Sequence, residues 1–310
     1  MAPRPIIIDT DPGQDDCIAI LLALASPELE ILGLTAVAGN VGVDLTAANA
    51  LKICEIAGRP DIKVFRGCDR PLEKPLTIAP EIHGKSGLDG ADLPPPRMAL
   101  QRDHAVDWLI ATLMGRPDRG TTLVALGPLT NLATALCREP RIARKIDELV
   151  VMGGASRALG NVTPAAEFNI HVDPHAADIV LAGGIPTALM TLDVTHQVLA
   201  TRARRDRIRD LGTPAAATVA RLLEFYAKRE RVGPDGVPLH DPCTIAYLLD
   251  PTLFSGERIN VAIELAGTHT TGMTVMDWRR RTGRAPNCLV FREVDHERFF
   301  ALLTERLGRL

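Results

Sequence analysis

Four aspartates, Asp9, Asp11, Asp15 and Asp16, lie within eight residues near the start of the chain. Carboxylates held this close together repel one another unless a cation or shared protons lie between them. Carboxylate oxygens are also the ligands that hard divalent cations such as Ca²⁺ and Mg²⁺ prefer. One or two aspartates would be read as helix caps in a solvated turn. Four of them, directly after an apolar segment, favour a site for a divalent cation.

The segments on either side of these aspartates indicate where the carboxylates lie. Residues 6–8 are three isoleucines, which are typical of a short buried strand. Pro12-Gly13 is a turn signal, and residues 17–25 are an apolar run of good helix formers. The order is therefore strand, acidic turn, helix. The second pair of aspartates falls at the start of the helix, where the helix dipole favours negative charge.

Polar or glycine-bearing turns follow several later strands as well. Asn40 follows a strand predicted at residues 29–37. Leu126, Gly153 and Asp193 end or follow strands predicted at residues 121–126, 147–152 and 187–192. The alternation of strands and helices predicts an α/β fold, with an open, mainly parallel, Rossmann-like central sheet flanked by helices. Ligands of such sheets bind at the carboxyl ends of the strands, so we expect the active site there.

The remaining pattern fits one domain covering residues 1–310. Helices are expected at residues 44–57, 103–114, 129–136, 174–182, 243–249 and 295–307, with two more between 200 and 232. Further strands are expected at residues 62–65, 259–265 and 288–292. The segment at about 200–250 is a helical excursion that we expect near the active site.

Two histidines are candidates for chemistry. His83 lies among glycines in an irregular segment, residues 67–96, and a loop of that length inside a compact domain is often functional. His240 and Asp241 precede the helix at residues 243–249, where they could simply cap the helix. The acidic turn makes Asp241 a credible further metal ligand.

Residues 160–170 form a polar segment that also contains Phe168. Asn161, Glu167 and Asn169 offer donors and acceptors that suit hydroxyl groups. Asparagine also favours turns, so turn formation is the alternative explanation for this segment.

Composition argues against several classes of function. A net charge of −3 gives no electrostatic reason to bind nucleic acid or an anionic membrane. The longest apolar run is too short to span a bilayer, and the N-terminus lacks a signal peptide, so we expect a cytoplasmic protein. The six cysteines contain no C-x-x-C pair, which indicates buried thiols rather than a metal knuckle.

The sequence resembles the inosine–uridine-preferring nucleoside hydrolases over almost its whole length. The most specific element is Asp9-Thr10-Asp11-Pro12-Gly13-Gln14-Asp15-Asp16, the DxDPGxDD signature of that family. Supporting segments occur in the family's order at residues 37–40, 83–88, 125–131, 151–154, 167–169 and 240–242. The resemblance implies an enzyme of nucleoside salvage that hydrolyses the N-glycosidic bond of ribonucleosides to ribose and free base.

The resemblance also implies a Ca²⁺ ion held by Asp11, Asp16, Asp241 and the backbone carbonyl of Leu126. The family often has threonine at position 126, but a contact through the carbonyl should tolerate leucine. Asp11 would act as general base toward a water molecule that the ion activates. Asp9 would support these ligands through hydrogen bonds.

The substrate contacts follow from the same resemblance. Asp15 and Asn40 would bind the lower ribose hydroxyls or position water. His240 would protonate the leaving base, because the pKa of histidine is ordinarily near working pH, and His83 would lie beside the base. The other expected substrate contacts are Met152, Asn161, Glu167, Phe168 and Asn169.

Two alternatives remain open at this level. A strand followed by Asp9-Thr10-Asp11 also resembles the start of a haloacid-dehalogenase-type phosphatase, although Pro12-Gly13 departs from that pattern. A non-catalytic nucleoside-binding protein would keep the same ligands without releasing base.

The preference for purine or pyrimidine bases is not determined by these motifs. The helices around residues 220–235, including Tyr226, Arg229 and Arg231, are candidates for a lid over the base. Relatives are commonly homodimers or homotetramers, so the resemblance implies a homo-oligomer.

Overall fold

A sheet of eight strands runs through the molecule in the order β3-β2-β1-β4-β5-β6-β12-β9. The computed structural model describes residues 2–229 and 236–310. Neighbouring strands pair in parallel except at one edge, where β9 is antiparallel to β12. The strands of this sheet are β1 Arg4–Thr10, β2 Leu29–Ala36, β3 Val64–Arg66, β4 Thr121–Ala125, β5 Ile146–Met152, β6 Thr187–Met190, β9 Phe254–Ile259 and β12 Cys288–Val294. The expected open, mainly parallel sheet is confirmed.

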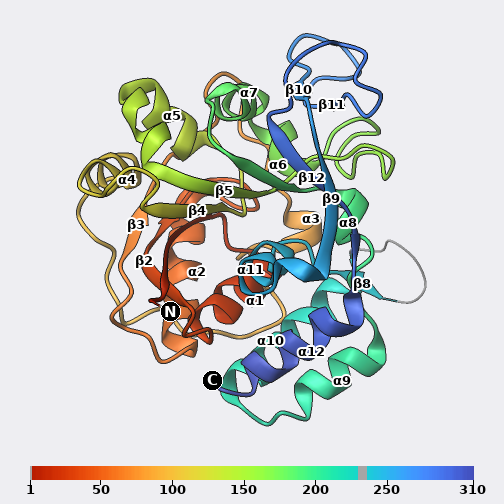
Figure 1. The fold of residues 1–310 in the computed structure, drawn as a ribbon. Coiled ribbons are helices and arrows are strands. Elements are labelled where there is room, and N and C mark those ends of the chain that lie inside the picture. The colour runs from red at the N-terminus through yellow and green to blue at the C-terminus, as the bar shows by residue number, and fades with distance from the viewer. Residues whose placement is uncertain (1, 230–235) are drawn as a thin grey trace.

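Helices cover both faces of the sheet, with α4, α5 and α7 on one side and α1, α10, α11 and α12 on the other (Figure 1). The helices are α1 Gln14–Leu24, α2 Val43–Ile56, α3 Pro80–His83, α4 Ala105–Met114, α5 Thr130–Arg138, α6 Phe168–Val172, α7 Pro174–Ala182, α8 Leu192–Thr195, α9 Arg202–Arg209, α10 Pro214–Tyr226, α11 Pro242–Leu249 and α12 His296–Leu307, with 3₁₀ turns η1 Pro140–Lys145 and η2 Pro251–Leu253. Two small antiparallel pairs complete the fold, β7 Leu199–Ala200 with β8 Val237–Pro238 and β10 Val261–Ile263 with β11 Thr274–Met276.

Strand β1 lies at the centre of the molecule and is buried on both sides. Ile6 and Ile8 pack into one core cluster, whereas Ile7 packs into the cluster on the opposite face of the sheet. This alternation follows from the two-residue period of a strand. A fully buried strand explains why the sequence shows an unbroken apolar run here rather than an alternating one.

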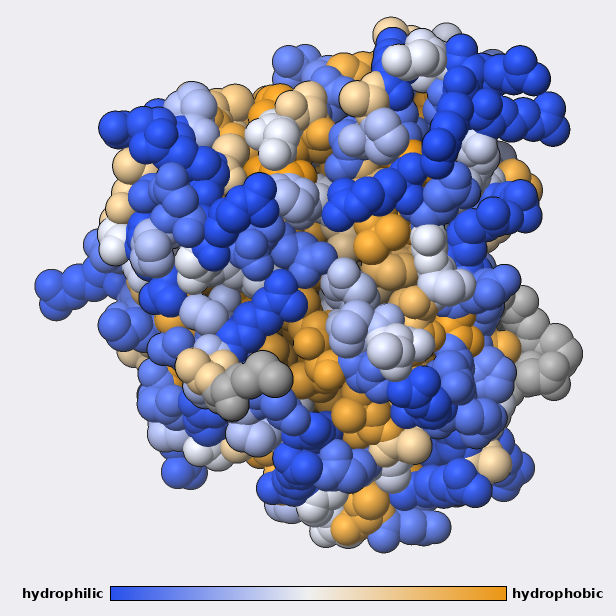
Figure 2. Space-filling view, in the orientation of Figure 1, coloured by the Kyte–Doolittle hydropathy of each residue, from blue (hydrophilic) through white to orange (hydrophobic). Residues whose placement is uncertain are grey.

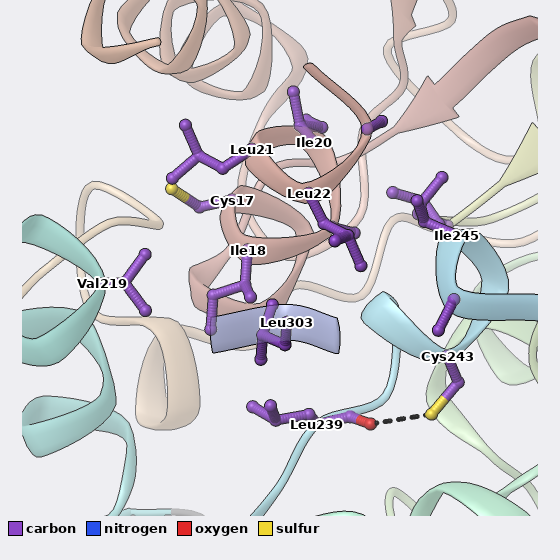
Figure 3. Close-up of a cluster of buried hydrophobic side chains, with 14 of the residues drawn as sticks. Cys17, Ile18, Ile20, Leu21, Leu22, Val219, Leu239, Cys243, Ile245 and Leu303 are labelled. Carbon is purple, nitrogen blue, oxygen red and sulfur yellow. Dashed lines mark hydrogen bonds between the residues drawn. The ribbon is translucent and has the colours of Figure 1, made fainter. Parts of the chain in front are cut away.

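Helix α1 is buried along its whole length. Its side chains, including Ile18 and Leu22, belong to one core cluster with Val219 of α10, Ile245 of α11 and Leu303 of α12 (Figure 3). Burying each such side chain contributes about 1.5–3 kcal/mol. The helix that carries Asp15 and Asp16 is therefore clamped against the helix that begins after Asp241.

One expected strand is wrong in its extent. The strand predicted at residues 259–265 is divided between the edge strand β9 and the small strand β10. Asn287 explains the division, because its side chain accepts from the backbone N–H of Val261 and donates to the carbonyl of Val261. These bonds satisfy the backbone polar groups of Val261 where pairing with β12 ends and pairing with β11 begins.

On the face shown in Figure 2, hydrophilic side chains cover most of the periphery and hydrophobic ones gather in a band across the middle. Among the described residues, the helices lack the length and apolar character that a bilayer span requires.

Candidate active site

A cavity of about 230 Å³ lies at the carboxyl ends of the parallel strands. Its lining comes from segments spread along the chain: Asp15, Asp16, Asn40, Ala79, Glu81, Ile82, His83, Leu126, Met152, Asn161, Val162, Glu167, Phe168, Asn169, Tyr226, His240 and Asp241. All of the expected metal ligands and substrate contacts are in this lining except Asp11, and Asp9, the expected supporting residue, also lies outside it. The fold therefore gathers residues from widely separated parts of the chain into one place, as expected from the positions of the strand ends.

Three buried carboxylates face one another in this cavity. Asp15, Asp16 and Asp241 each place an oxygen within 4.8 Å of the others. Asp16 is held in place by the Thr10 hydroxyl at 2.5 Å and by the backbone N–H of Gly13 at 2.9 Å. Burial is the largest cause that raises the pKa of Asp16 and of Asp241, and the neighbouring carboxylates raise the pKa of Asp241 further.

This group fits a divalent cation. Burial and mutual repulsion make three ionised carboxylates costly unless positive charge lies among them. The donors are oxygens, which suit a hard cation such as Ca²⁺ or Mg²⁺. Two of the expected ligands, Asp16 and Asp241, belong to the group, and Asp15 is its third member. The third expected carboxylate ligand, Asp11, lies next to this group and interacts electrostatically with Asp16 and Asp15.

Asp11 lies beside this group in a niche between two glycines. Its Oδ2 accepts the backbone N–H of Asn40 at 2.7 Å. A Cβ atom would lie 2.0 Å from Oδ2 if built on Gly39, and 2.3 Å from Oδ1 if built on Gly127. Oδ1 is buried without a hydrogen-bond partner among the described residues. Burial, followed by the charge of Asp16, raises the pKa of Asp11 well above its ordinary value.

Asp9 lies on the other side of the same turn and is fully buried. Its Oδ1 accepts hydrogen bonds from the Thr35 hydroxyl and from Asn131 Nδ2. Burial raises the pKa of Asp9 to about 7, although these two hydrogen bonds lower it. Its contacts are thus with neighbouring strand and helix residues rather than with the cavity.

His83 and His240 line the cavity and are both buried. His83 Nδ1 lies 2.7 Å from Gln14 Oε1, and its ring stacks with Tyr226 at 5.9 Å between centroids. His240 Nδ1 lies 2.8 Å from the Thr195 hydroxyl. Burial lowers the pKa of each histidine to about 3, so both rings are neutral near pH 7.

The polar segment at residues 161–169 closes another side of the cavity. Asn161 Oδ1 accepts the backbone N–H of Phe168 at 3.0 Å. The Glu167 carboxylate caps α6 by accepting the N–H groups of Asn169 and Ile170, and it also accepts that of Gly154. Burial raises the pKa of Glu167, and these bonds lower it.

Asn169 links this segment to the expected metal ligand at position 126. Its Nδ2 donates to the carbonyl of Leu126 at 2.7 Å and to that of Met152 at 3.2 Å. A carbonyl oxygen has two lone pairs, so that of Leu126 retains one for a second partner.

Sequence reasoning did not single out two residues that orient the histidines. Gln14 stands inside the acidic motif, which was the available signal, but its contact with His83 spans 69 positions. Thr195 contacts His240 across 45 positions and had no comparable signal.

Of the expected lid residues, Tyr226 lines the cavity, and Arg229 Nη1 donates to the carbonyls of Pro80 and Glu81. Arg231 lies outside the described residues.

The fold and this acidic cavity together define an α/β enzyme with a polar site at the strand ends. The chain matches the family described as inosine-uridine preferring nucleoside hydrolase over residues 6–301. It therefore belongs to this family, and it is a ribonucleoside hydrolase that cleaves an N-glycosidic bond.

Curated relatives match over nearly their entire lengths. A pyrimidine-specific ribonucleoside hydrolase of Klebsiella pneumoniae is 48% identical over 307 residues, which cover 98% of each chain. One of Salmonella typhi is 49% identical over 306 residues, again covering 98% of each chain. An uncharacterized protein of Schizosaccharomyces pombe is 47% identical over 307 residues, covering 98% of this chain and 99% of its own.

Solved structures of nucleoside hydrolases share the fold. A purine-preferring ribonucleoside hydrolase from Gardnerella vaginalis superposes with a TM-score of 0.91 at 35% identity, covering 98% of both chains. A plant nucleoside hydrolase superposes with a TM-score of 0.92 at 36% identity, covering 99% of both chains.

Proposed function

We propose that this enzyme prefers pyrimidine ribonucleosides, and that it cleaves uridine and cytidine to ribose and the free base. The observation that carries the preference is the close similarity to relatives named pyrimidine-specific, which share nearly half of their residues with this chain. The purine-preferring solved structure is more distant, at 35% identity.

Calcium is the cation that we propose for the acidic site. Asp11, Asp16 and Asp241 would hold it together with the carbonyl of Leu126, and Asp15 lies close enough to supply a further oxygen. When bound, the ion supplies a Lewis acid that makes a neighbouring water molecule easier to deprotonate. The buried all-oxygen donor set supports this choice.

Asp11 is the proposed general base. Its carboxylate is buried, its position is fixed by the Asn40 N–H, and one of its oxygens has no partner among the described residues. A fixed acceptor of this kind can take a proton from water as the water attacks C1′ of the ribose. Glycoside cleavage passes through an oxocarbenium-like state, and carboxylates near the ring stabilise its positive charge.

The remaining residues divide between the sugar and the base. Asp15 and Asn40 are proposed to bind the lower ribose hydroxyls. His240 would donate to the leaving base, and His83 would lie beside it. The other proposed substrate contacts are Met152, Asn161, Glu167, Phe168 and Asn169, all of which line the cavity.

Membership of the nucleoside hydrolase family removes the reason to consider a haloacid-dehalogenase-type phosphatase. The alternative of a protein that binds nucleosides without cleaving them predicts that no base is released.

The test is a panel of uridine, cytidine, inosine, adenosine and guanosine, each followed for release of free ribose by the calcium-loaded protein. We expect kcat/KM to be highest for the two pyrimidine nucleosides. A higher value for any purine nucleoside would overturn the preference. Absence of ribose from all five reactions would overturn the hydrolytic function.

A further inference from the structure

The side chain of Gln14 determines which nitrogen of His83 carries a proton. Gln14 Nε2 lies 3.2 Å from the backbone carbonyl of His83 and 3.1 Å from that of Asp89. Two carbonyl partners identify this end of the amide as the NH₂ group, so Oε1 at the other end is an acceptor. Oε1 lies 2.7 Å from His83 Nδ1, and therefore Nδ1 donates. In a neutral ring, Nε2 is then an acceptor.

Thr195 imposes the opposite arrangement on His240. Its hydroxyl lies 2.8 Å from His240 Nδ1, and both residues are buried. Within residues 2–229 and 236–310, this nitrogen is the only hydrogen-bond partner of the hydroxyl. A buried hydroxyl places its proton in a hydrogen bond, so Thr195 donates to Nδ1. The proton of the neutral His240 ring is therefore on Nε2.

The two remaining nitrogens face the same cavity. His83 and His240 both line it. Some side-chain polar atoms of the described residues are fully buried and lack a hydrogen-bond partner, but the Nε2 atoms of these two rings do not belong to that set. Both rings are buried, and burial disfavours the charged form of each. The cavity thus presents one imidazole acceptor, on His83, and one imidazole N–H donor, on His240.

We propose that Gln14 and Thr195 are positioning residues that hold the two histidines of the cavity in opposite tautomers, so that together they present one acceptor and one donor to a nucleobase. This inference rests on the proposed function. Uracil offers an N–H beside carbonyl oxygens, and cytosine offers an amino group and a carbonyl oxygen, so either base can satisfy both histidines. A ring that lacks one of these groups leaves a buried polar atom unpaired, which costs affinity. The device also places a donor at the leaving base without a charged imidazolium.

The tautomers are read directly by two-bond ¹H–¹⁵N correlation spectra of protein labelled with ¹⁵N-histidine. The chain has eight histidines, so the two signals are assigned by their loss in His83→Asn and His240→Asn. We expect an Nδ1–H ring for His83 and an Nε2–H ring for His240. The same tautomer in both rings, or the reverse assignment, overturns the proposal. The spectra do not depend on turnover. A protein that releases no ribose would therefore overturn the proposed function, whereas the tautomers would still be decided by the spectra alone.

Thr195→Val and Thr195→Ser test the positioning role. Valine removes the hydroxyl, so the His240 signal should move toward the Nδ1–H form. The kcat for uridine should fall about 10- to 100-fold, with little change for a nitrophenyl riboside, whose leaving group needs no donor. Serine keeps the hydroxyl and should restore both the tautomer and uridine turnover. An unchanged His240 tautomer in Thr195→Val overturns the role of Thr195. If the valine variant fails to fold, the spectra of the unchanged protein and of Thr195→Ser still decide.

Discussion

Asp241 brings a distant part of the chain to the acidic turn, where its carboxylate lies close to those of Asp15 and Asp16. The charges of Asp15, Asp16 and Asp11 all raise its pKa, in addition to burial. At the scale of single residues, this mutual repulsion is the strongest argument that positive charge belongs in the site, because buried like charges are otherwise costly.

Asp241→Asn should therefore abolish most of the thermal stabilisation that Ca²⁺ gives. A cation present at about 100 times its Kd stabilises the folded state by about 2.7 kcal/mol, and loss of one of three carboxylates should remove much of that. Differential scanning calorimetry with and without calcium measures the shift. Asp44→Asn, which alters an aspartate with a largely exposed side chain on α2, is the matched control. A full calcium shift in Asp241→Asn would contradict the assignment.

His83 should make the protein less stable in acid. Its pKa is lowered from 6.5 to about 3 by burial, so the unfolded chain binds its proton at a higher pH than the folded chain does. Its contribution to stability is present above about pH 6.5 and is lost as the pH falls toward 3. In His83→Asn, the free energy of unfolding from urea titrations should fall less steeply as the pH falls over this range. The slope should differ from that of the unchanged protein by the equivalent of up to one bound proton. Parallel pH profiles for the two proteins would show that His83 does not contribute.

At the scale of elements, the turns after β2 and β4 position Asp11, because their glycines form the niche that holds its carboxylate. Gly127→Ala would place a Cβ atom 2.3 Å from Asp11 Oδ1 and so displace the proposed base. A misplacement of about 1 Å costs about 100-fold in rate, so we expect a loss of that order in kcat. Gly42→Ala is the matched control, because a Cβ there meets nothing within 4 Å. Comparable kcat values for the two variants would contradict the niche.

The sequence predicted the central elements well for a physical reason. β1 and α1 have continuous apolar patterns that tertiary contacts reinforce, so local and global preferences agree. The strand at residues 259–265 was predicted too long because the side chain of Asn287 interrupts it from a distant position. Helix α6 has only five residues and shows no helical period, so the sequence did not indicate a helix there.

The site was predictable where chemistry is concentrated in a motif and not where it depends on distant contacts. The acidic turn, Asn40 and Asp241 stood out by residue type and by their place at strand or helix ends. The partners of the histidines did not, because their contacts join positions that are 69 and 45 residues apart in the chain. Asp11, which the sequence also singled out as a ligand, lies beside the carboxylate group in the glycine niche.

At the scale of the whole molecule, the site depends on one packed cluster that joins α1 to α10, α11 and α12 (Figure 3). Ile18→Ala removes a fully buried side chain of this cluster and should lower the free energy of unfolding by about 2–5 kcal/mol. Leu45→Ala, at a position that is 43% exposed, should change it little. Urea unfolding of both variants measures the difference, and equal effects would contradict the clamping role of the cluster. Assembly into a homo-oligomer and a cytoplasmic location stay predictions.

Ribose release from uridine before and after removal of metal tests the central claim most directly. Protein treated with a chelator and then desalted should release almost no ribose, and added Ca²⁺ should restore release together with an equal amount of uracil. Ribose release at the full rate by the chelated protein, or none after calcium is restored, would contradict a reaction that depends on a cation held by aspartates from distant parts of the chain.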